Sequence, residues 1–245
     1  FVGGGSVLFG VLSLKQQGRI DIKGDIYASD LNKTLIDTYK HIQQQPNELK
    51  KVFSKYTKEY DEGDSKEYYY QARKLFNSGL LSPIDRSAVF MMLNKSCFRG
   101  LYREGPNGFN VPFGHYKKVT WLSDSEIDKI SYLLQGVKFE CIGFDKALEK
   151  VQCGDLVYAD PPYAPESAKS FVNYTSKGFD EENHKQLFGM LNAVDEKGGR
   201  IDMSNSDVDF VKDHFKKYKC DVIVARRAIN SKKPGAKTNE VLIYN

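Results

Sequence analysis

Four consecutive residues, Asp160-Pro161-Pro162-Tyr163, form the part of the sequence best suited to chemistry. The two prolines fix the backbone and supply no N–H donor, so the Asp160 carboxylate and a proline carbonyl remain as hydrogen-bond acceptors. A pair of acceptors suits an NH2 group. Tyr163 adds a flat ring on which a nucleobase taken out of its stack can lie. The alternative is an ordinary turn after a strand, with an exposed tyrosine.

A glycine-rich turn at residues 1–5 is a second candidate site. Its sequence predicts the end of a buried strand followed by a tight turn, and residues 6–15 carry apolar side chains at helical spacing. Because glycine has no Cβ, such a turn lets a cofactor approach the backbone closely. A nicotinamide-type turn or the remnant of a tag would also explain three glycines in a row.

The next predicted strand covers residues 26–28 and runs out at Ser29-Asp30. A predicted helix at 31–44 follows directly after Asp30. An acidic residue at this place accepts hydrogen bonds from a ribose diol in nucleotide-binding sheets. It can also cap the N-terminus of the helix that follows. The two roles are compatible, and the sequence alone leaves both open.

These elements alternate as strand, helix, strand and helix, which predicts an α/β fold with a parallel sheet and ligands at the carboxyl ends of its strands. Residues 46–135 interrupt the alternation, because they are rich in Lys, Tyr and Phe and predict several helices followed by an irregular stretch. We therefore predict one domain from residues 1–45 and 136–245, and an inserted domain at 46–135. The later predicted elements are strands at 138–143, 156–159, 200–204, 220–227 and 239–244, with helices at 180–195 and 207–217.

Cationic and aromatic side chains alternate in a turn-rich segment of the predicted insertion. Proteins that read DNA bases or wedge between base steps use such a mixture, although a solvated basic loop has the same composition. The residues are Lys95, Phe98, Arg99, Tyr102, Arg103, His115, Tyr116, Lys117 and Lys118. A second basic cluster, suited to contacts with phosphates, consists of Arg226, Arg227, Lys232, Lys233 and Lys237.

The composition argues against several classes of protein. With 40% hydrophobic residues, the 245-residue chain can fill a core, and it has no apolar run long enough for a membrane span. Its start lacks the features of a signal peptide. The four cysteines are scattered and no histidine lies at metal-ligand spacing, so we expect no metal, no disulfide framework and an intracellular location. The net charge of +4 permits binding to nucleic acid.

Taken together, the motifs resemble those of the DNA adenine-N6 methyltransferases of the Dam type. In that family the active-site motif is Asp-Pro-Pro-Tyr and the cofactor loop reads Phe-x-Gly-x-Gly. The similarity covers nearly the whole chain and keeps the order of the family's motifs. The matching segments are Phe1–Gly5, Ser29–Asn32, Gly100–Arg103, Phe109–Gly114, Asp160–Tyr163, Phe171–Tyr174, Ser204-Asn205 and Arg226–Ile229.

The resemblance implies a Rossmann-like methyltransferase sheet whose insertion is a mainly helical target-recognition domain with a hairpin. It also implies S-adenosyl-L-methionine as the cofactor and catalysis by Asp160, Pro161, Pro162 and Tyr163. Family members carry a further cofactor-binding segment before the glycine loop, so we expect this chain to hold only part of that site. The cofactor-binding residues implied here are Phe1, Gly3, Gly5, Asp30, Phe144 and Asp160. Phe144 would lie against the cofactor's adenine, although a core aromatic is the commoner case.

Double-stranded DNA is the implied substrate, with a short palindromic target, GATC or a related site. Leu101 and Pro112 then join the residues expected to bind DNA, and Arg103 is placed for a bidentate contact with guanine. Two neighbouring positions depart from the family, since Arg99 stands where Asn is frequent and His115 where Arg is frequent. We expect a monomer or a weak dimer.

Other functions share parts of this pattern. Methylation of cytosine N4, of RNA or of a protein amide also requires acceptors for an NH2 group, and only the resemblance favours adenine. A nicotinamide oxidoreductase lacks support because the later glycine spacing is absent and Asp160–Tyr163 would be unexplained. A DNA-binding relative without activity would keep the basic, aromatic segment and the cofactor fold.

Overall fold

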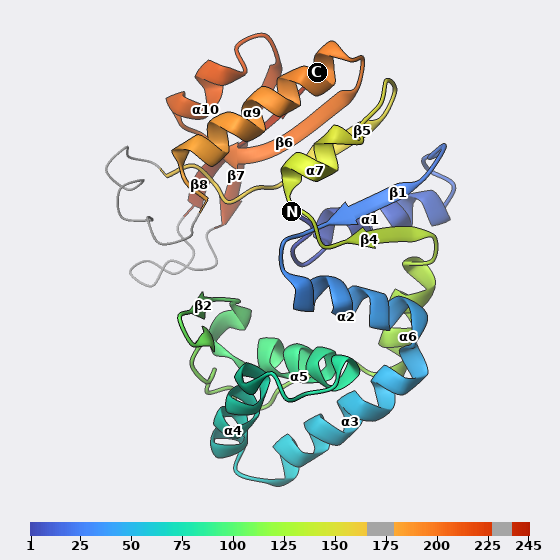
Figure 1. Cartoon of the computed structure of the whole chain (residues 1–245), viewed down its shortest axis with the longest axis vertical. Coiled ribbons are helices and arrows are strands. Elements are labelled where there is room, and N and C mark those ends of the chain that lie inside the picture. The colour runs from blue at the N-terminus through green and yellow to red at the C-terminus, as the bar shows by residue number, and fades with distance from the viewer. Residues whose placement is uncertain (166–178, 227–236) are drawn as a thin grey trace. The chain divides into compact units, whose positions relative to one another are not determined.

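The computed structural model describes residues 1–165, 179–226 and 237–245 (Figure 1). These residues form two compact units. The first comprises Val2–Cys141, and the second comprises Phe1 together with Ile142–Asn245. Each unit has a hydrophobic core of its own.

The first unit is mainly helical and contains two short pairs of strands. β1 pairs in parallel with β4, and β2 with β3 forms a small antiparallel hairpin. Its elements are α1 (Ser6–Gln16), β1 (Ile26–Ser29), α2 (Lys33–Gln44), α3 (Pro46–Glu62), α4 (Ser65–Ser78), α5 (Pro83–Ser96), η1 (Phe98–Gly100), β2 (Glu104–Gly105), β3 (Gly108–Phe109), α6 (Asp124–Leu133) and β4 (Val137–Glu140).

Side-chain caps fix where several of these helices begin. Asn32 caps α2 by accepting a hydrogen bond from the Leu35 amide, and Asp64 does the same at α4 with two amides. Ser82 caps α5, and Ser123 forms a capping box at α6. Such caps satisfy backbone N–H groups that have no partner inside the helix.

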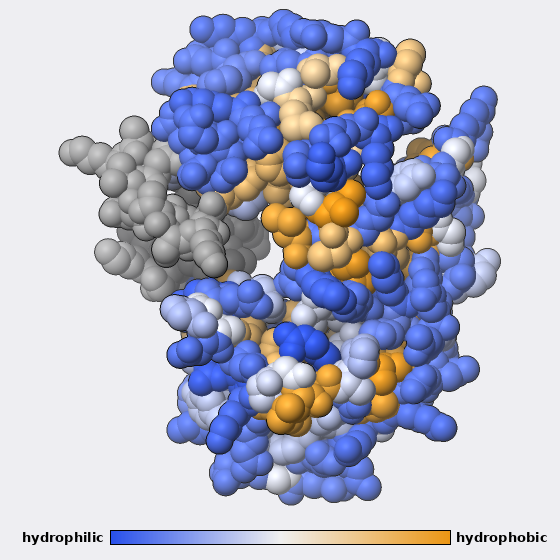
Figure 2. All heavy atoms as spheres, viewed as in Figure 1, coloured by the Kyte–Doolittle hydropathy of each residue, from blue (hydrophilic) through white to orange (hydrophobic). Residues whose placement is uncertain are grey.

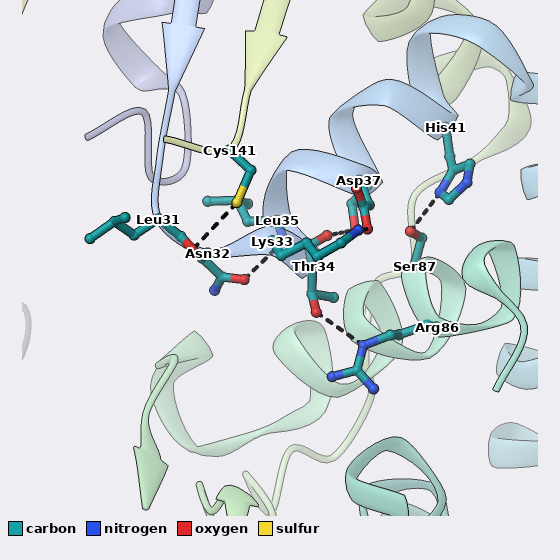
Figure 3. A network of polar contacts seen from close by, with 11 residues as sticks. Leu31, Asn32, Lys33, Thr34, Leu35, Asp37, His41, Arg86, Ser87 and Cys141 are labelled. Carbon is teal, nitrogen blue, oxygen red and sulfur yellow. Dashed lines mark hydrogen bonds and ion pairs between the residues drawn. The ribbon is translucent and has the colours of Figure 1, made fainter. Parts of the chain in front are cut away.

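Polar contacts join α2 to α5, as Figure 3 shows. The Arg86 Nε donates to the Thr34 hydroxyl at 3.1 Å, and the His41 Nδ1 lies 2.8 Å from the Ser87 hydroxyl. Packing thus groups residues before and after position 46 around one core, which runs from Leu12 to Phe139. The predicted division into one domain at residues 1–45 and 136–245 and an inserted domain at 46–135 remains a prediction.

The second unit is built on a four-stranded mixed sheet in the order β5-β6-β8-β7. β5 is parallel to β6, whereas β8 is antiparallel to both β6 and β7. Helix α9 packs on β6, and its buried residues include Leu187 and Phe188 (Figure 1). The elements are α7 (Phe144–Glu149), β5 (Leu156–Ala159), α9 (Glu181–Glu196), β6 (Arg200–Ser206), α10 (Asp209–His214), β7 (Lys219–Arg226) and β8 (Lys237–Tyr244).

The observed class is mixed α/β with small sheets, which confirms the predicted α/β class. The strand predicted to end at the glycine turn is not formed, since residues 1–5 are a turn without strand pairing, and the four-stranded sheet is mixed rather than parallel. Hydrophilic residues cover most of the surface visible in Figure 2. No helix in the described part of the chain has the length and apolarity that a membrane span requires.

Candidate functional site

The glycine turn is held in place by the backbone of β1. The Val2 amide donates to the Ser29 carbonyl at 2.9 Å, and the Gly5 amide closes the turn on the Val2 carbonyl at 2.9 Å. Gly5 has a φ of 74°, which disfavours residues with a side chain. A Cβ on Gly5 would also lie 2.6 Å from the Tyr39 hydroxyl oxygen. This position therefore requires glycine for two independent reasons.

Asp30 ties this turn to the start of α2. One carboxylate oxygen accepts from the Gly3 amide at 3.1 Å, and the other accepts from the Asn32 amide at 3.0 Å. The helix cap is Asn32 rather than Asp30, because the Asn32 side chain accepts from the Leu35 amide (Figure 3). Each oxygen of Asp30 keeps a second lone pair that a ligand hydroxyl can use.

Tyr39 supports the same turn from the core. Its hydroxyl donates to the Gly3 carbonyl at 2.9 Å, and its ring stacks on Phe139 at 4.9 Å. Burial, with a smaller contribution from the negative charge of Asp30, raises the pKa of Tyr39 to about 12. The phenol is therefore protonated at neutral pH and remains a donor. The sequence analysis gave this residue no role in the site.

The outer side of the turn is open. A Cβ placed on Gly3 or on Gly4 would meet no atom within 4 Å, whereas Gly5 is packed against Phe9 and Tyr39. The turn thus exposes backbone on one side and is braced on the other. This arrangement fits a cofactor that lies directly against the backbone, which is what glycines without a Cβ allow.

Three aromatic side chains cluster in the second unit. The rings of Phe1 and Phe144 stack at 5.7 Å, and Phe179 meets them edge-on at 5.5 and 5.7 Å. The structure therefore brings together two of the predicted cofactor residues, and each ring is only partly buried. The sequence analysis missed Phe179. Its position in the sequence could have indicated it, because Phe179 directly precedes Asp180, the N-cap of α9. An apolar residue directly before an N-cap commonly packs against the first turn of the helix.

Asp160 lies exposed just beyond β5, as predicted. The Ser204 hydroxyl donates to its Oδ1 at 2.7 Å, and the Tyr158 hydroxyl lies 3.1 Å from the Ser204 oxygen. Within the described ranges, Oδ2 of Asp160 takes part in no hydrogen bond. The carboxylate is thus oriented through one oxygen while the other remains available to a substrate donor.

Tyr163 follows Asp160 by three residues and has a partly exposed ring. The side chain is 37% exposed, and its hydroxyl donates to Glu240 Oε2 at 3.3 Å. Burial chiefly, together with the charges of Asp160 and Glu240, raises the pKa of Tyr163 to about 12. The ring is therefore uncharged at neutral pH and partly open to solvent, as a stacking surface should be.

Two buried polar side chains hold the backbone on either side of Tyr163. His184 Nε2 lies 2.9 Å from the Pro162 carbonyl oxygen, and the Ala164 amide donates to Asn205 Oδ1 at 2.8 Å. Asn205 was part of a matching motif but had no assigned role, and His184 was missed. No local pattern marks His184, which reaches the loop from α9.

The predicted DNA-binding residues come from two segments that lie side by side. Cys97 and Phe113 form an isolated bridge, and the Phe98 amide donates to the Pro112 carbonyl at 2.8 Å. Arg103 lies at the hairpin formed by β2 and β3, and its Nε donates to the Asn110 side chain at 2.7 Å. That contact uses one of five N–H donors and orients the guanidinium group.

Arg99 and His115 have unusual backbone conformations. Their φ angles are 57° and 54°, and among the described residues they alone combine a positive φ with a side chain. Such positions cost energy and cluster at functional sites. They are also the two positions at which a departure from the family's frequent residues was expected from the sequence. Both side chains are exposed.

The structure describes only some of the other residues predicted to bind DNA. Lys95 and Lys117 are exposed, and Arg226 ends β7. The predicted residues Arg227, Lys232 and Lys233, and the matching segment at 171–174, lie outside the described residues. In the part of the chain that is described, no group of three His, Cys, Asp or Glu side chains could hold a metal ion.

Comparison with known proteins identifies the family. Residues 1–229 match the family of D12 class N6 adenine-specific DNA methyltransferases. The chain is 34% identical to the type II methyltransferase M.MjaIII of Methanocaldococcus jannaschii, with 100% of this chain and 86% of the relative aligned. It is 31% identical to M1.LlaDCHI of Lactococcus lactis subsp. cremoris, over 100% of this chain and 84% of the relative.

A further relative is the DNA adenine methylase of Escherichia coli K12, which is 30% identical over 94% of this chain and 79% of its own length. These matches confirm the resemblance inferred from the eight motifs. The chain therefore belongs to the D12 class of N6 adenine-specific DNA methyltransferases, and it is an enzyme that methylates adenine in DNA.

Proposed function

We propose that the enzyme transfers a methyl group from S-adenosyl-L-methionine to adenine N6 in double-stranded DNA, at a short palindromic site such as GATC. The observation that carries the proposal is the position and hydrogen bonding of the Asp160 carboxylate. This carboxylate stands at the carboxyl end of β5, is oriented by Ser204 through Oδ1, and has Oδ2 available. Two prolines and a partly exposed tyrosine follow it.

In this mechanism the target adenine leaves the duplex and its ring stacks on Tyr163. The Asp160 carboxylate and the Pro161 carbonyl accept hydrogen bonds from the two N–H groups of N6. These contacts direct the nitrogen lone pair away from the acceptors and toward the methyl donor. Once N6 carries the methyl group, it releases one of these protons to the Asp160 carboxylate. S-adenosyl-L-methionine, when bound, supplies a methyl group on a positively charged sulfur. Orientation and electrostatics then account for the catalysis without a covalent nucleophile.

Each unit offers residues suited to part of the cofactor. The open backbone of Gly3 and the turn closed at Gly5 support close approach, and Asp30 has lone pairs for a ribose diol. The paired rings of Phe1 and Phe144 suit an adenine ring. Asp160 would contribute near the transferred methyl group.

We propose that residues 46–135 recognise the target and that 1–45 with 136–245 form a Rossmann-like catalytic domain. The hairpin β2–β3 and the paired segments around Phe98 and Pro112 support this division. DNA contacts would come from Lys95, Phe98, Arg99, Leu101, Arg103, Pro112, His115 and Lys117, with phosphate contacts from Arg226, Arg227, Lys232 and Lys233. The enzyme would act on intracellular DNA as a monomer or weak dimer.

Replacing Asp160 by alanine should lower kcat by at least about 100-fold, because the variant lacks the acceptor aimed at the amino group. Folding and DNA affinity should change little, since the side chain is exposed and, within the described residues, its one hydrogen bond is that from Ser204. Transfer of labelled methyl groups to duplex DNA measures the loss. The matched control is Asp221→Ala on β7, whose carboxylate accepts a hydrogen bond from Tyr244 and whose removal should leave kcat unchanged. Near-normal turnover of Asp160→Ala would refute the assignment.

Replacing Tyr163 by alanine should cost at least about tenfold more activity than replacing it by phenylalanine, because stacking needs the ring. Phenylalanine keeps the ring and loses the hydroxyl group, with its contacts to Glu240 and Ser204. Since the pKa of Tyr163 is raised to about 12, the phenol stays neutral, and the rates of the wild type and of Tyr163→Phe should vary in parallel between pH 7 and 9. Equal damage by both substitutions would count against stacking.

Asp30→Ala should weaken cofactor binding more than DNA binding, because it frees the Gly3 amide and removes the predicted ribose acceptor. Isothermal titration calorimetry with S-adenosyl-L-methionine tests this. Asp25→Ala serves as the control, since Asp25 precedes the same strand but binds Lys138 at the surface. Unchanged affinity combined with lower thermal stability would assign Asp30 a purely structural role.

Arg103→Ala should cost on the order of 1 to 3 kcal/mol of DNA-binding free energy and relax discrimination at one base pair. Lys117→Ala, at an exposed cation nearby, should weaken binding to all sequences equally and lower its salt dependence. Binding to a set of duplexes that differ at single positions separates the two effects. An unaltered sequence preference of Arg103→Ala would exclude a readout role.

A further inference from the structure

The short segment that carries Tyr163 is anchored on both sides by side chains from the core. On one side the Pro162 carbonyl oxygen lies 2.9 Å from His184 Nε2, and on the other the Ala164 amide donates to Asn205 Oδ1 at 2.8 Å. His184 is 1% exposed and Asn205 is fully buried. The two anchors come from different elements, α9 and β6.

We propose that His184 is a positioning residue for methyl transfer, which donates a hydrogen bond from Nε2–H to the Pro162 carbonyl and thereby fixes the ring of Tyr163. The inference rests on the function proposed above, in which this ring receives the target base. His184 touches neither base nor cofactor in this account. It acts through the backbone of the loop, and Asn205 provides the second fixed point.

The chemistry of the loop explains why an outside donor is needed. Pro161 and Pro162 have no N–H groups, so the turn cannot be closed by amides of its own in the usual way. Pro162 is exposed, but its carbonyl oxygen lies against the buried His184 ring, where a carbonyl without a donor costs free energy. His184 provides that donor from the first turns of a 16-residue helix, which is a more rigid support than a loop.

Aromatic packing holds the imidazole ring in this orientation. Its centroid lies 4.7 Å from that of Phe179 and 5.8 Å from that of Phe188, with the rings nearly edge-on to one another. Phe179 also packs against Phe1 and Phe144, the two aromatics proposed to contact the cofactor. His184 therefore lies between this aromatic cluster and the loop that carries Tyr163, and it contacts both.

A competing role follows from the other ring nitrogen. His184 Nδ1 lies 2.8 Å from the Asp180 carbonyl, four residues earlier in the chain. Both neighbours are acceptors, and a neutral imidazole can donate to only one of them. Donation from Nδ1 would make His184 a local brace of α9, with no consequence for the reaction. Donation from Nε2 makes it a support of the loop.

Two substitutions distinguish these roles, because the amide nitrogen of Gln can replace Nε2 and that of Asn can replace Nδ1. We expect His184→Asn to lower the single-turnover rate by about 10- to 100-fold, with KM for DNA and cofactor affinity changed less than about threefold. His184→Gln should keep the rate within about threefold of the wild type. Equal rates for the two variants, or a lower rate for Gln, would overturn the proposal.

Hydrogen exchange gives a readout that does not depend on activity. The Ala164 amide, which donates to Asn205, should exchange faster in His184→Asn than in His184→Gln or the wild type, because the loop loses one of its two anchors. If the wild-type chain methylated no DNA, the proposed function would fail while this comparison would still decide the role of His184. Equal protection in both variants would contradict it.

His214 supplies a matched control. Its Nδ1 lies 2.7 Å from the carbonyl four residues earlier, that of Phe210, and its ring packs against the same Phe188 at 5.2 Å. It has no contact with the loop at Pro162 among the contacts found in the described residues. His214→Asn and His214→Gln should therefore give equal rates and equal exchange of the Ala164 amide. A difference at His214 as large as that at His184 would show that the effect is not specific to the loop.

Discussion

The parallel pairing of β5 with β6 is the interaction on which the proposed acceptor site depends. Val157 is opposite Ile201 and Ala159 is opposite Met203, so Asp160, just beyond the end of β5, lies next to Ser204 within β6. The full burial of Ile201 and Met203 fixes this register, because a shift by one residue would turn them to the other face. Core packing thus sets the hydrogen bond that orients the Asp160 carboxylate.

The same core supplies the supports of the Asp-Pro-Pro-Tyr loop. Asn205 follows Ser204 on β6, and His184 lies on α9, which packs on that strand. One small sheet and one helix therefore define the direction of the carboxylate, the course of the loop and the position of the Tyr163 ring. The glycine turn of the first unit follows the same principle, since Tyr39 and Asp30 brace it against the end of β1.

The sequence was informative wherever chemistry depends on residues adjacent in the chain. The loop at Asp160, the strand before it and the glycine turn were predicted because proline, glycine and an apolar run have strong local effects. The start of α2 was predicted two residues too early. The cap proved to be Asn32, because the Asp30 carboxylate accepts a hydrogen bond from the Gly3 amide instead. That contact joins residues 27 positions apart, which no local pattern reveals.

Long-range contacts explain the other omissions. Phe179, His184 and Tyr39 act on segments from which they are remote in sequence, and each resembles an ordinary core residue in its own helix or loop. The backbone angles of Arg99 and His115 also could not be predicted, because no local sequence pattern marks a left-handed conformation at an arginine or a histidine.

The central claim is that the acceptor is the amino group of adenine in DNA. Its most direct test is nucleoside mass spectrometry of duplex DNA treated with the purified chain and S-adenosyl-L-methionine, followed by mapping of the modified base. The account predicts N6-methyladenine confined to one short palindromic sequence. N4-methylcytosine as the product, or N6-methyladenine spread without regard to sequence, would contradict it.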